Sequence, residues 1–310
     1  MIVDTHTHLW QSLDQLGPQI SALMRQRYPV ANERLDASSA SHEAATAALD
    51  LVFVLGFRSV HLGADVPNAL ISHYVTARRD RMIGFAGIDP MADDWSDQMD
   101  ELPSLKLSGV VISPSEQAFH PTHSRAMKLY DKAQSMGLPV IIYQGSQFTR
   151  DSHLEFARPA LLDEVARSFP QLRMLITHSG HPWAEELLTL IRKHNNLFTE
   201  LSVLTTRPWQ LYQVLLTAHH LEVTDRVMFG SSFPYQMPQQ AIETIYSVNQ
   251  FAQGTALPAV PREKLRSIIE RDALSALGLK RGIQSESAPP TPVRPTPSRV
   301  TTPSRDESDS

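Results

Sequence analysis

The run Leu51-Val52-Phe53-Val54-Leu55-Gly56 sets the type of sheet that this chain forms. Five successive apolar residues, β-branched and aromatic among them, are typical of a strand that is buried on both faces. Strands of this kind belong to parallel sheets, which helices cover on either side. The chain contains seven further strand-like runs: Ile2–Thr5, Met82–Ile88, Gly109–Ser113, Pro139–Gln144, Arg173–His178, Leu197–Leu201 and Arg226–Gly230.

Longer amphipathic segments separate these runs and predict helices. The clearest are Val66–Arg79, His123–Met136, Pro159–Phe169, Trp183–Lys193, Trp209–His220 and Gln239–Phe251, with a terminal helix at Arg262–Leu279. Eight strand-and-helix units predict an α/β fold, a single closed (β/α)₈ barrel of the TIM type. A doubly wound open sheet is the alternative, but no Gly-x-Gly-x-x-Gly turn follows the first strand.

Two segments stand outside this alternation. Residues 10–40 predict a long, irregular loop insertion after the first strand, which in a barrel would lie at the mouth, where lids are found. In residues 281–310, Pro, Ser and Thr make up 16 of 30 positions. Such a composition cannot bury enough apolar surface to offset the entropy of ordering. We therefore expect one barrel domain over residues 1–280 and a disordered tail over 281–310, whose partner is unknown.

Composition excludes several classes of protein. The 310 residues carry 28 Lys and Arg against 33 Asp and Glu, a net charge of −5, with 13 His and no Cys. The absence of Cys excludes disulfide frameworks, thiolate zinc sites and Cys nucleophiles. Mild acidity argues against a nucleic-acid partner.

Hydropathy bears on location. No apolar run approaches the roughly 20 residues that span a bilayer, and the start of the chain has no secretory signal pattern. We therefore expect a cytoplasmic protein without a membrane partner. A small-molecule substrate is the expected partner, and the sequence leaves a homo-oligomer open.

Histidines lie where two predicted strands end. In a barrel, chemistry takes place at the carboxyl ends of the strands. His6 and His8 are two apart on the first strand, so both imidazoles face the same side and could share one divalent cation. His178 ends the sixth strand and could act as a ligand, a general acid or base, or a hydrogen-bond donor. The alternative for all three is ordinary hydrogen bonding at a strand end.

Three motifs carry a family resemblance: Asp4–His8, Thr177–Trp183 and Phe229–Pro234. Together, and in this order and spacing, they resemble the amidohydrolase superfamily. The most similar branch is the amidohydrolase-related one, which includes metal-dependent hydrolases and nonoxidative decarboxylases such as aminocarboxymuconate-semialdehyde decarboxylase. The resemblance covers residues 1 to about 280 and does not extend to the tail.

The resemblance implies one divalent metal, with Zn expected and Mn or Fe as alternatives. In that branch the first-strand histidine pair, a histidine ending the fifth strand and an aspartate ending the eighth strand hold the metal. His6 and His8 match the pair, and His178 matches a sixth-strand histidine that takes part in catalysis.

Two positions depart from this pattern. Tyr143 stands where the branch has the fifth-strand histidine, and Ser232 stands where it has the aspartate. A neutral serine is a poor ligand and no base at pH 7, and a phenol binds a cation well only when it ionises. The sequence therefore predicts a degenerate site whose metal is weakly bound or absent.

The resemblance also implies a small carboxylate, amide, ester or lactone as the substrate. Arg150 and Arg207 follow the fifth and seventh strands and could bind a carboxylate, although a surface salt bridge explains each of them slightly better. The remaining candidates for substrate contact are Trp10, Trp183 and Tyr235, for which packing is the alternative. His181 is a further candidate, for which a position behind the site or at the start of the next helix is the alternative.

Two hypotheses about function follow. The first is a metal-dependent hydrolase or decarboxylase with an altered site, in which His178 moves a proton. The second is a catalytically inactive homologue that serves as a ligand-binding or scaffold protein. His6, His8 and His178 favour the first hypothesis, and Tyr143 and Ser232 favour the second.

Overall fold

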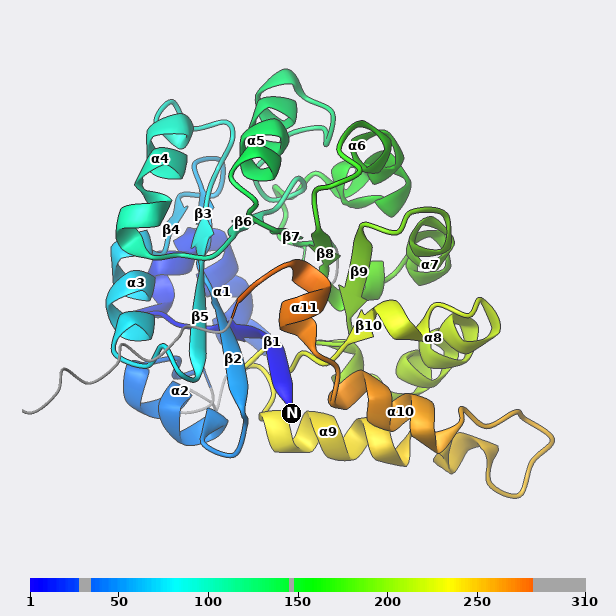
Figure 1. Cartoon of the computed structure of the whole chain (residues 1–310). Coiled ribbons are helices and arrows are strands. Elements are labelled where there is room, and N and C mark those ends of the chain that lie inside the picture. The colour runs from blue at the N-terminus through cyan, green and yellow to red at the C-terminus, as the bar shows by residue number, and fades with distance from the viewer. Residues whose placement is uncertain (28–34, 145–147, 281–310) are drawn as a thin grey trace, which may run out of the picture.

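Eight parallel strands form a nearly closed barrel, as predicted (Figure 1). The computed structural model describes residues 1–27, 35–144 and 148–280. The barrel strands, in the order in which they pair, are β1 (Val3–His8), β2 (Leu51–Leu55), β5 (Met82–Gly87), β6 (Val110–Ile112), β7 (Val140–Ile142), β8 (Met174–Ile176), β9 (Leu197–Glu200) and β10 (Val227–Met228). Every pair between neighbours in this order is parallel.

The segment after β10 returns to β1 and closes the ring. Thr7 pairs with Phe233 in a parallel bridge. The amide of Thr5 donates to the carbonyl of Phe229 at 3.0 Å, and the amide of Ser232 donates to the carbonyl of His6 at 2.8 Å. The first and eighth strand ends are therefore neighbours, although more than 220 residues separate them along the chain.

Helices surround the strands, as a parallel sheet requires (Figure 1). The α-helices are α1 (Gly17–Arg27), α2 (Ser39–Thr46), α3 (Asn68–Thr76), α4 (Trp95–Leu105), α5 (Ser124–Ser135), α6 (Asp163–Ser168), α7 (Ala184–Lys193), α8 (Pro208–His220), α9 (Pro238–Ser247), α10 (Arg262–Ile269) and α11 (Ala273–Leu277). Short 3₁₀ segments are η1 (Leu13–Leu16), η2 (Leu154–Ala157), η3 (Pro159–Leu162), η4 (Thr177–Gly180), η5 (Leu204–Thr206), η6 (Thr224–Arg226) and η7 (Val248–Ala252). A two-stranded hairpin, β3 (Arg58–Ser59) and β4 (Ala64–Asp65), lies outside the barrel sheet.

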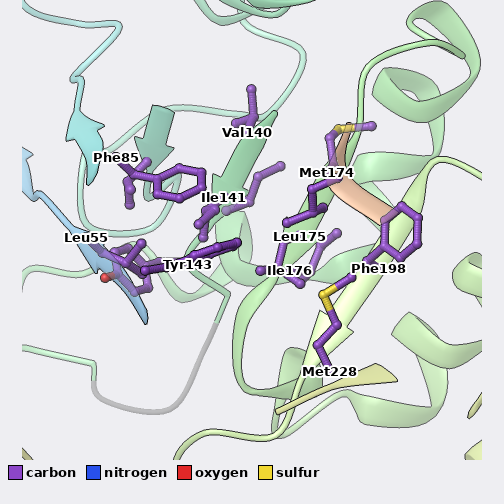
Figure 2. Close-up of a cluster of buried hydrophobic side chains, with 14 of the residues drawn as sticks. Leu55, Phe85, Val140, Ile141, Tyr143, Met174, Leu175, Ile176, Phe198 and Met228 are labelled. Carbon is purple, nitrogen blue, oxygen red and sulfur yellow. The ribbon is translucent and has the colours of Figure 1, made fainter. Parts of the chain in front are cut away.

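The barrel core is apolar on both sides of the strands. All five residues of β2 are buried, which accounts for the continuous apolar run that predicts this strand. Figure 2 shows Ile141, Leu175 and Met228, from three different strands, within one buried cluster. At roughly 25 cal/mol per Å² of apolar surface, burial of this kind is the main source of the barrel's stability.

Two predicted elements differ from the structure. The insertion is present after β1, but its described residues are not wholly irregular, because they contain η1 and α1. Leu16, Ile20 and Met24 repeat every four residues on one buried side of this segment. The predicted terminal helix is two helices, α10 and α11. Asp272 is the N-cap of α11, because its side chain accepts a hydrogen bond from the amide of Ser275.

The predicted tail at 281–310 lies outside the described residues. Among the residues that are described, no helix combines the length and apolar character needed to cross a membrane.

Candidate functional site

The predicted site residues gather at the carboxyl ends of the barrel strands. The ring of His6 lies 4.9 Å from that of His8, 5.0 Å from that of His178 and 5.3 Å from that of Tyr143, measured between centroids. His6 and His8 come from β1, Tyr143 directly follows β7, and His178 lies in η4 after β8. The hydroxyl of Tyr143 is 3.4 Å from Nδ1 of His8.

A buried glutamate holds two of these histidines. Glu200 ends β9, and its Oε1 lies 3.0 Å from Nδ1 of His6 and accepts from the amide of His178 at 2.7 Å. The hydroxyl of Ser202 donates to the same oxygen at 2.8 Å, and the amide of Ser202 donates to Oε2. Both side chains of the pair His6 and Glu200 are inaccessible to solvent. The carboxylate is therefore paired at both oxygens, as a buried charge requires.

These contacts determine which nitrogen of each ring carries the proton. A carboxylate only accepts hydrogen bonds, so the Nδ1 of His6 is the protonated nitrogen and donates to Glu200. The Ser202 hydroxyl uses its proton toward Glu200, so it accepts from Nδ1 of His178, which is 2.7 Å away. Both rings then have a lone pair at Nε2. Nε2 of His6 is buried and has no partner among the described residues.

Burial keeps the three imidazoles neutral. It lowers the pKa of His6 and of His178 to about 3 and takes the pKa of His8 well below its usual value. Burial also raises the pKa of the Tyr143 phenol well above 10, so this side chain is neutral at pH 7. None of these four groups brings a charge to the site under physiological conditions.

Backbone geometry aims these side chains. His178 has φ 56° and Ser232 has φ 61°, and both are in the left-handed region that non-glycine residues rarely adopt. Each such residue costs on the order of 1–3 kcal/mol, and such strain gathers at functional sites. Gly230 is required for a different reason, because a Cβ there would lie 2.5 Å from Oε2 of Glu200.

A pocket opens above this network at the barrel mouth. Its empty space, including the part open to solvent, is about 640 Å³. The described residues that line it are His8, Trp10, Leu16, Ile20, Met24, Phe57, Ser113, Ser115, Glu116, Tyr143, His178, Val203, Ser232 and Tyr235. Apolar and aromatic walls with a few polar groups are typical of a small-molecule site.

One described group of ligand-type residues has the spacing of a metal site. Atoms of His6, His178 and Glu200 lie within 4.8 Å of one another. His8 is not part of this group. The Ser202 hydroxyl lies among the three, 3.1 Å from Nδ1 of His6, 2.7 Å from Nδ1 of His178 and 2.8 Å from Oε1 of Glu200. On the Nδ1 side of the two imidazoles, the Ser202 hydroxyl therefore occupies the centre of this group of ligand-type residues.

A family model described as amidohydrolase matches residues 3–277. The chain belongs to the amidohydrolase family. The match spans all eight barrel strands and confirms the resemblance that the three sequence motifs carry. A search of curated proteins finds no match.

Several solved structures have the same fold as this amidohydrolase family member. An uncharacterised TIM-barrel protein from Bordetella bronchiseptica is 20% identical, with a TM-score of 0.67, over 89% of this chain and 99% of that one. A dihydroxybenzoic acid decarboxylase from Polaromonas sp. JS666, with bound manganese and an inhibitor, is 11% identical, with a TM-score of 0.65, over 89% and 96% of the two chains. A Burkholderia multivorans amidohydrolase with bound zinc is 14% identical, with a TM-score of 0.65, over 90% and 100%. At these identities the likeness concerns the fold alone.

Among the predicted substrate contacts, the structure brings Trp10 and Tyr235 to the pocket. The other four candidates in this amidohydrolase do not line it. His181 and Trp183 line a separate depression against α7 and α8. Arg150 is exposed beside α1, and Arg207 is part-exposed at the start of α8. Arg150 follows β7, His181 and Trp183 follow β8, and Arg207 follows β9. These connections carry all four side chains away from the pocket, so a position after a strand is not enough to place a residue in the mouth.

Three polar residues at the site are absent from the sequence prediction. Glu200 lies within the predicted strand Leu197–Leu201, where a lone acidic residue in an apolar run was the available signal. Ser202 follows it by two positions and shares its network. Glu116 follows β6 and lines the pocket. A serine-rich loop after a strand carries no distinct signal, so Glu116 was not accessible to pattern reasoning.

Proposed function

We propose that this amidohydrolase family member is an enzyme that hydrolyses a small, largely apolar ester, lactone or amide in the pocket at the barrel mouth. The observation that carries the proposal is the hydrogen-bonded set of His6, His178, Ser202 and Glu200. It presents an imidazole lone pair to a pocket that is otherwise walled by aromatic and aliphatic side chains. A scaffold protein has no need of a buried charge that orients two histidines beneath a pocket.

We further propose that the divalent-metal site is degenerate and binds Zn²⁺, Mn²⁺ or Fe²⁺ weakly or not at all. His6 fits a ligand, because its Nε2 has no partner among the described residues and its Nδ1 donates to a carboxylate, as in metal-bound histidines. His8 and His178 are neutral imidazoles and could also be ligands. The oxygen donors do not fit, because both oxygens of Glu200 are already hydrogen-bonded and Tyr143 and Ser232 are neutral. The set therefore lacks the anionic ligand that the aspartate supplies in the family.

The chain's own residues suggest how hydrolysis would proceed. With Nδ1 bound to Ser202, His178 has Nε2 available in the pocket as a hydrogen-bond acceptor for the attacking water. Its pKa of about 3 suits it to orienting the water rather than to storing its proton. The hydroxyls of Ser232 and Tyr143 line the same pocket and could donate to the carbonyl oxygen of the substrate.

Decarboxylation of a small aromatic acid, the activity in the name of the Polaromonas relative, is less well supported. Recognition of a carboxylate normally uses Arg or Lys. The described lining of this pocket contains neither residue. Hydrolysis of an uncharged substrate is therefore our first choice between the two reactions.

Metal content and turnover test the proposal together. Purified protein should contain substoichiometric metal by mass spectrometry and should hydrolyse one or more members of a panel of aryl esters and lactones, with activity that survives chelation. His178→Gln should lower kcat/KM by about 10–100-fold, because an amide orients water less well. Stoichiometric metal, with activity lost on chelation, would contradict the degenerate site. No turnover of any compound would favour the inactive homologue.

A double substitution tests the reason for weak metal binding. Tyr143→His with Ser232→Asp restores the two ligand types that the family has at these positions, so Zn²⁺ affinity should rise by at least about tenfold, or about 1.4 kcal/mol. Isothermal titration with Zn²⁺ measures it. Tyr235→His, which changes a neighbouring pocket tyrosine, is the matched control and should leave the affinity within about threefold. If the double variant binds no more tightly than the wild type, the alignment of these strand ends is wrong.

A further inference from the structure

The loop after β6 carries the one acidic side chain among the described residues of the pocket lining. Ser113, Ser115 and Glu116 all contribute to the lining. Glu116 lines the pocket together with Tyr143, His178 and Ser232. A negative charge on Glu116 contributes to the raised pKa of the Tyr143 phenol.

This loop is held rigidly in place. The buried side chain of Gln117 accepts from the amide of Ser113 at 2.8 Å and donates to the carbonyls of Arg58 at 2.6 Å and Ile88 at 2.9 Å. The carbonyl of Glu116 itself accepts from the hydroxyl of Ser59 at 2.6 Å. The backbone on both sides of Glu116 is thus tied to the hairpin and to the end of β5. Such support is what a positioned functional group requires.

The carboxyl group has one oxygen engaged and one available. The hydroxyl of Ser113 donates to Oε2 at 2.8 Å. Within the described part of the chain, no hydrogen bond to Oε1 is present. Burial among apolar walls raises the pKa of Glu116 to about 7, and the bond from Ser113 lowers it in part.

The other titratable groups that face this pocket are His8, His178, Tyr143 and Tyr235. At pH 7 both histidines are neutral, because burial lowers their pKa values, and the Tyr143 phenol is neutral, because burial raises its pKa. A group that both takes and returns a proton works best when its pKa lies near the working pH. Glu116 meets this condition, and the imidazole of His178 does not.

We propose that Glu116 is the catalytic acid–base residue of this pocket and performs the task of the carboxylate that Ser232 replaces. This inference rests on the proposed hydrolysis. The carboxylate of Glu116 accepts a proton from water as the water oxygen forms a bond to the carbonyl carbon. The protonated carboxyl group then donates that proton to the leaving oxygen as its bond to carbon breaks. The products are an acid and an alcohol, and Glu116 returns to its starting state without any oxidant or reductant.

Paired esters test this assignment in the full-length protein. Phenyl acetate has a poorer leaving group than 4-nitrophenyl acetate and so depends more on proton return. Glu116→Gln should lower kcat/KM for phenyl acetate by about 100-fold or more, and by less for 4-nitrophenyl acetate. The limb of the pH–rate profile near pH 7 should disappear. Glu116→Asp should retain part of the activity, and Glu155→Gln, an exposed glutamate in η2, should change nothing.

The outcomes separate the two proposals. An active Glu116→Gln variant with an unchanged pH limb overturns the role of Glu116 and leaves the proposed hydrolysis standing. A wild-type protein without esterase, lactonase or amidase activity overturns both. A measurement that needs no turnover is carbon-13 NMR of protein labelled only at glutamate carboxyls. One carboxyl should titrate near pH 7 and be missing in Glu116→Gln, and the absence of such a signal in the wild type overturns the assignment.

Discussion

At the scale of single residues, Glu200 controls the state of the site. Its oxygens accept from a ring nitrogen, a hydroxyl and two backbone amides, and these donors set the tautomers of His6 and His178. These tautomers leave the lone pair of each ring at Nε2, where it can accept a proton or a hydrogen bond. A single carboxylate thus decides what two imidazoles can accept or bind.

Glu200→Gln tests this control. The amide replaces one acceptor oxygen with an NH₂ group, so at least one buried donor loses its partner. We expect the free energy of unfolding to fall by about 2–4 kcal/mol in urea titrations. Nitrogen-15 shifts of His6 should report a change in the protonated ring nitrogen. Glu101→Gln, on an exposed face of α4, is the control and should cost less than about 0.5 kcal/mol. A loss below 1 kcal/mol in Glu200→Gln would show that the network contributes little.

At the scale of secondary-structure elements, His42 connects α2 with β1 and α3. It lies on α2, and its Nε2 is 2.7 Å from the hydroxyl of Thr7 on β1, which itself donates to the carbonyl of Phe53. Its Nδ1 is 2.9 Å from the hydroxyl of Tyr74 on α3. Nε2 therefore donates and Nδ1 accepts, and the neutral ring is satisfied at both nitrogens.

The pH dependence of stability follows from this arrangement. Burial lowers the pKa of His42 from 6.5 to about 4. As the pH falls below 6.5, the unfolded chain gains a proton that the folded chain does not take. The stability contributed by neutral His42 is therefore complete above pH 6.5 and is lost as the pH falls toward 4. Below about pH 4 both states are protonated and the loss ends.

His42→Gln removes this titration. Between pH 4 and 6.5, the slope of unfolding free energy against pH should fall by up to about 1.4 kcal/mol per pH unit relative to the wild type. Urea unfolding at a series of pH values measures the slope, separately from the constant loss of the two hydrogen bonds. The surface variant His220→Gln at the end of α8 should leave the slope unchanged. An unaltered slope in His42→Gln would mean that the ring is not held neutral.

At the scale of the whole molecule, the barrel depends on a closing seam between β1 and the segment that follows β10. The hydroxyl of Thr5 donates to the carbonyl of Phe229 at 2.8 Å. Asp4 accepts from the amides of His6 and Ser231 at 3.1 and 2.9 Å. This seam also places Ser232 beside β1, so the contacts that close the barrel bring Ser232 to the site.

Thr5→Val tests the contribution of this seam. Valine keeps the shape of threonine and removes the hydroxyl donor, while the carbonyl of Phe229 still accepts from the amide of residue 5. We expect a loss of about 1 kcal/mol in the free energy of unfolding. Thr189→Val, which removes an exposed hydroxyl that donates to the carbonyl of Glu185 within α7, should cost less than about 0.5 kcal/mol. Equal effects of the two substitutions would argue that the seam has no special weight.

The barrel and the histidines at its strand ends can be predicted from the sequence alone. Eight apolar runs predict eight strands because burial on both faces leaves a local pattern, and His6, His8 and His178 were accessible because they directly end such runs. The sequence pattern does not predict the helix at Gly17–Arg27, because its apolar repeat is short.

Which polar residues share the pocket depends on the tertiary structure. Glu200 and Glu116 contact the site because closing the ring brings the ends of β9 and β6 to the same mouth as β1. Arg150 and Arg207 follow strands in the same way, yet their loops carry them outward. A pattern formed by residues close together in the sequence indicates which side of a strand or helix is buried. The direction of a loop side chain depends instead on contacts between segments far apart in the chain.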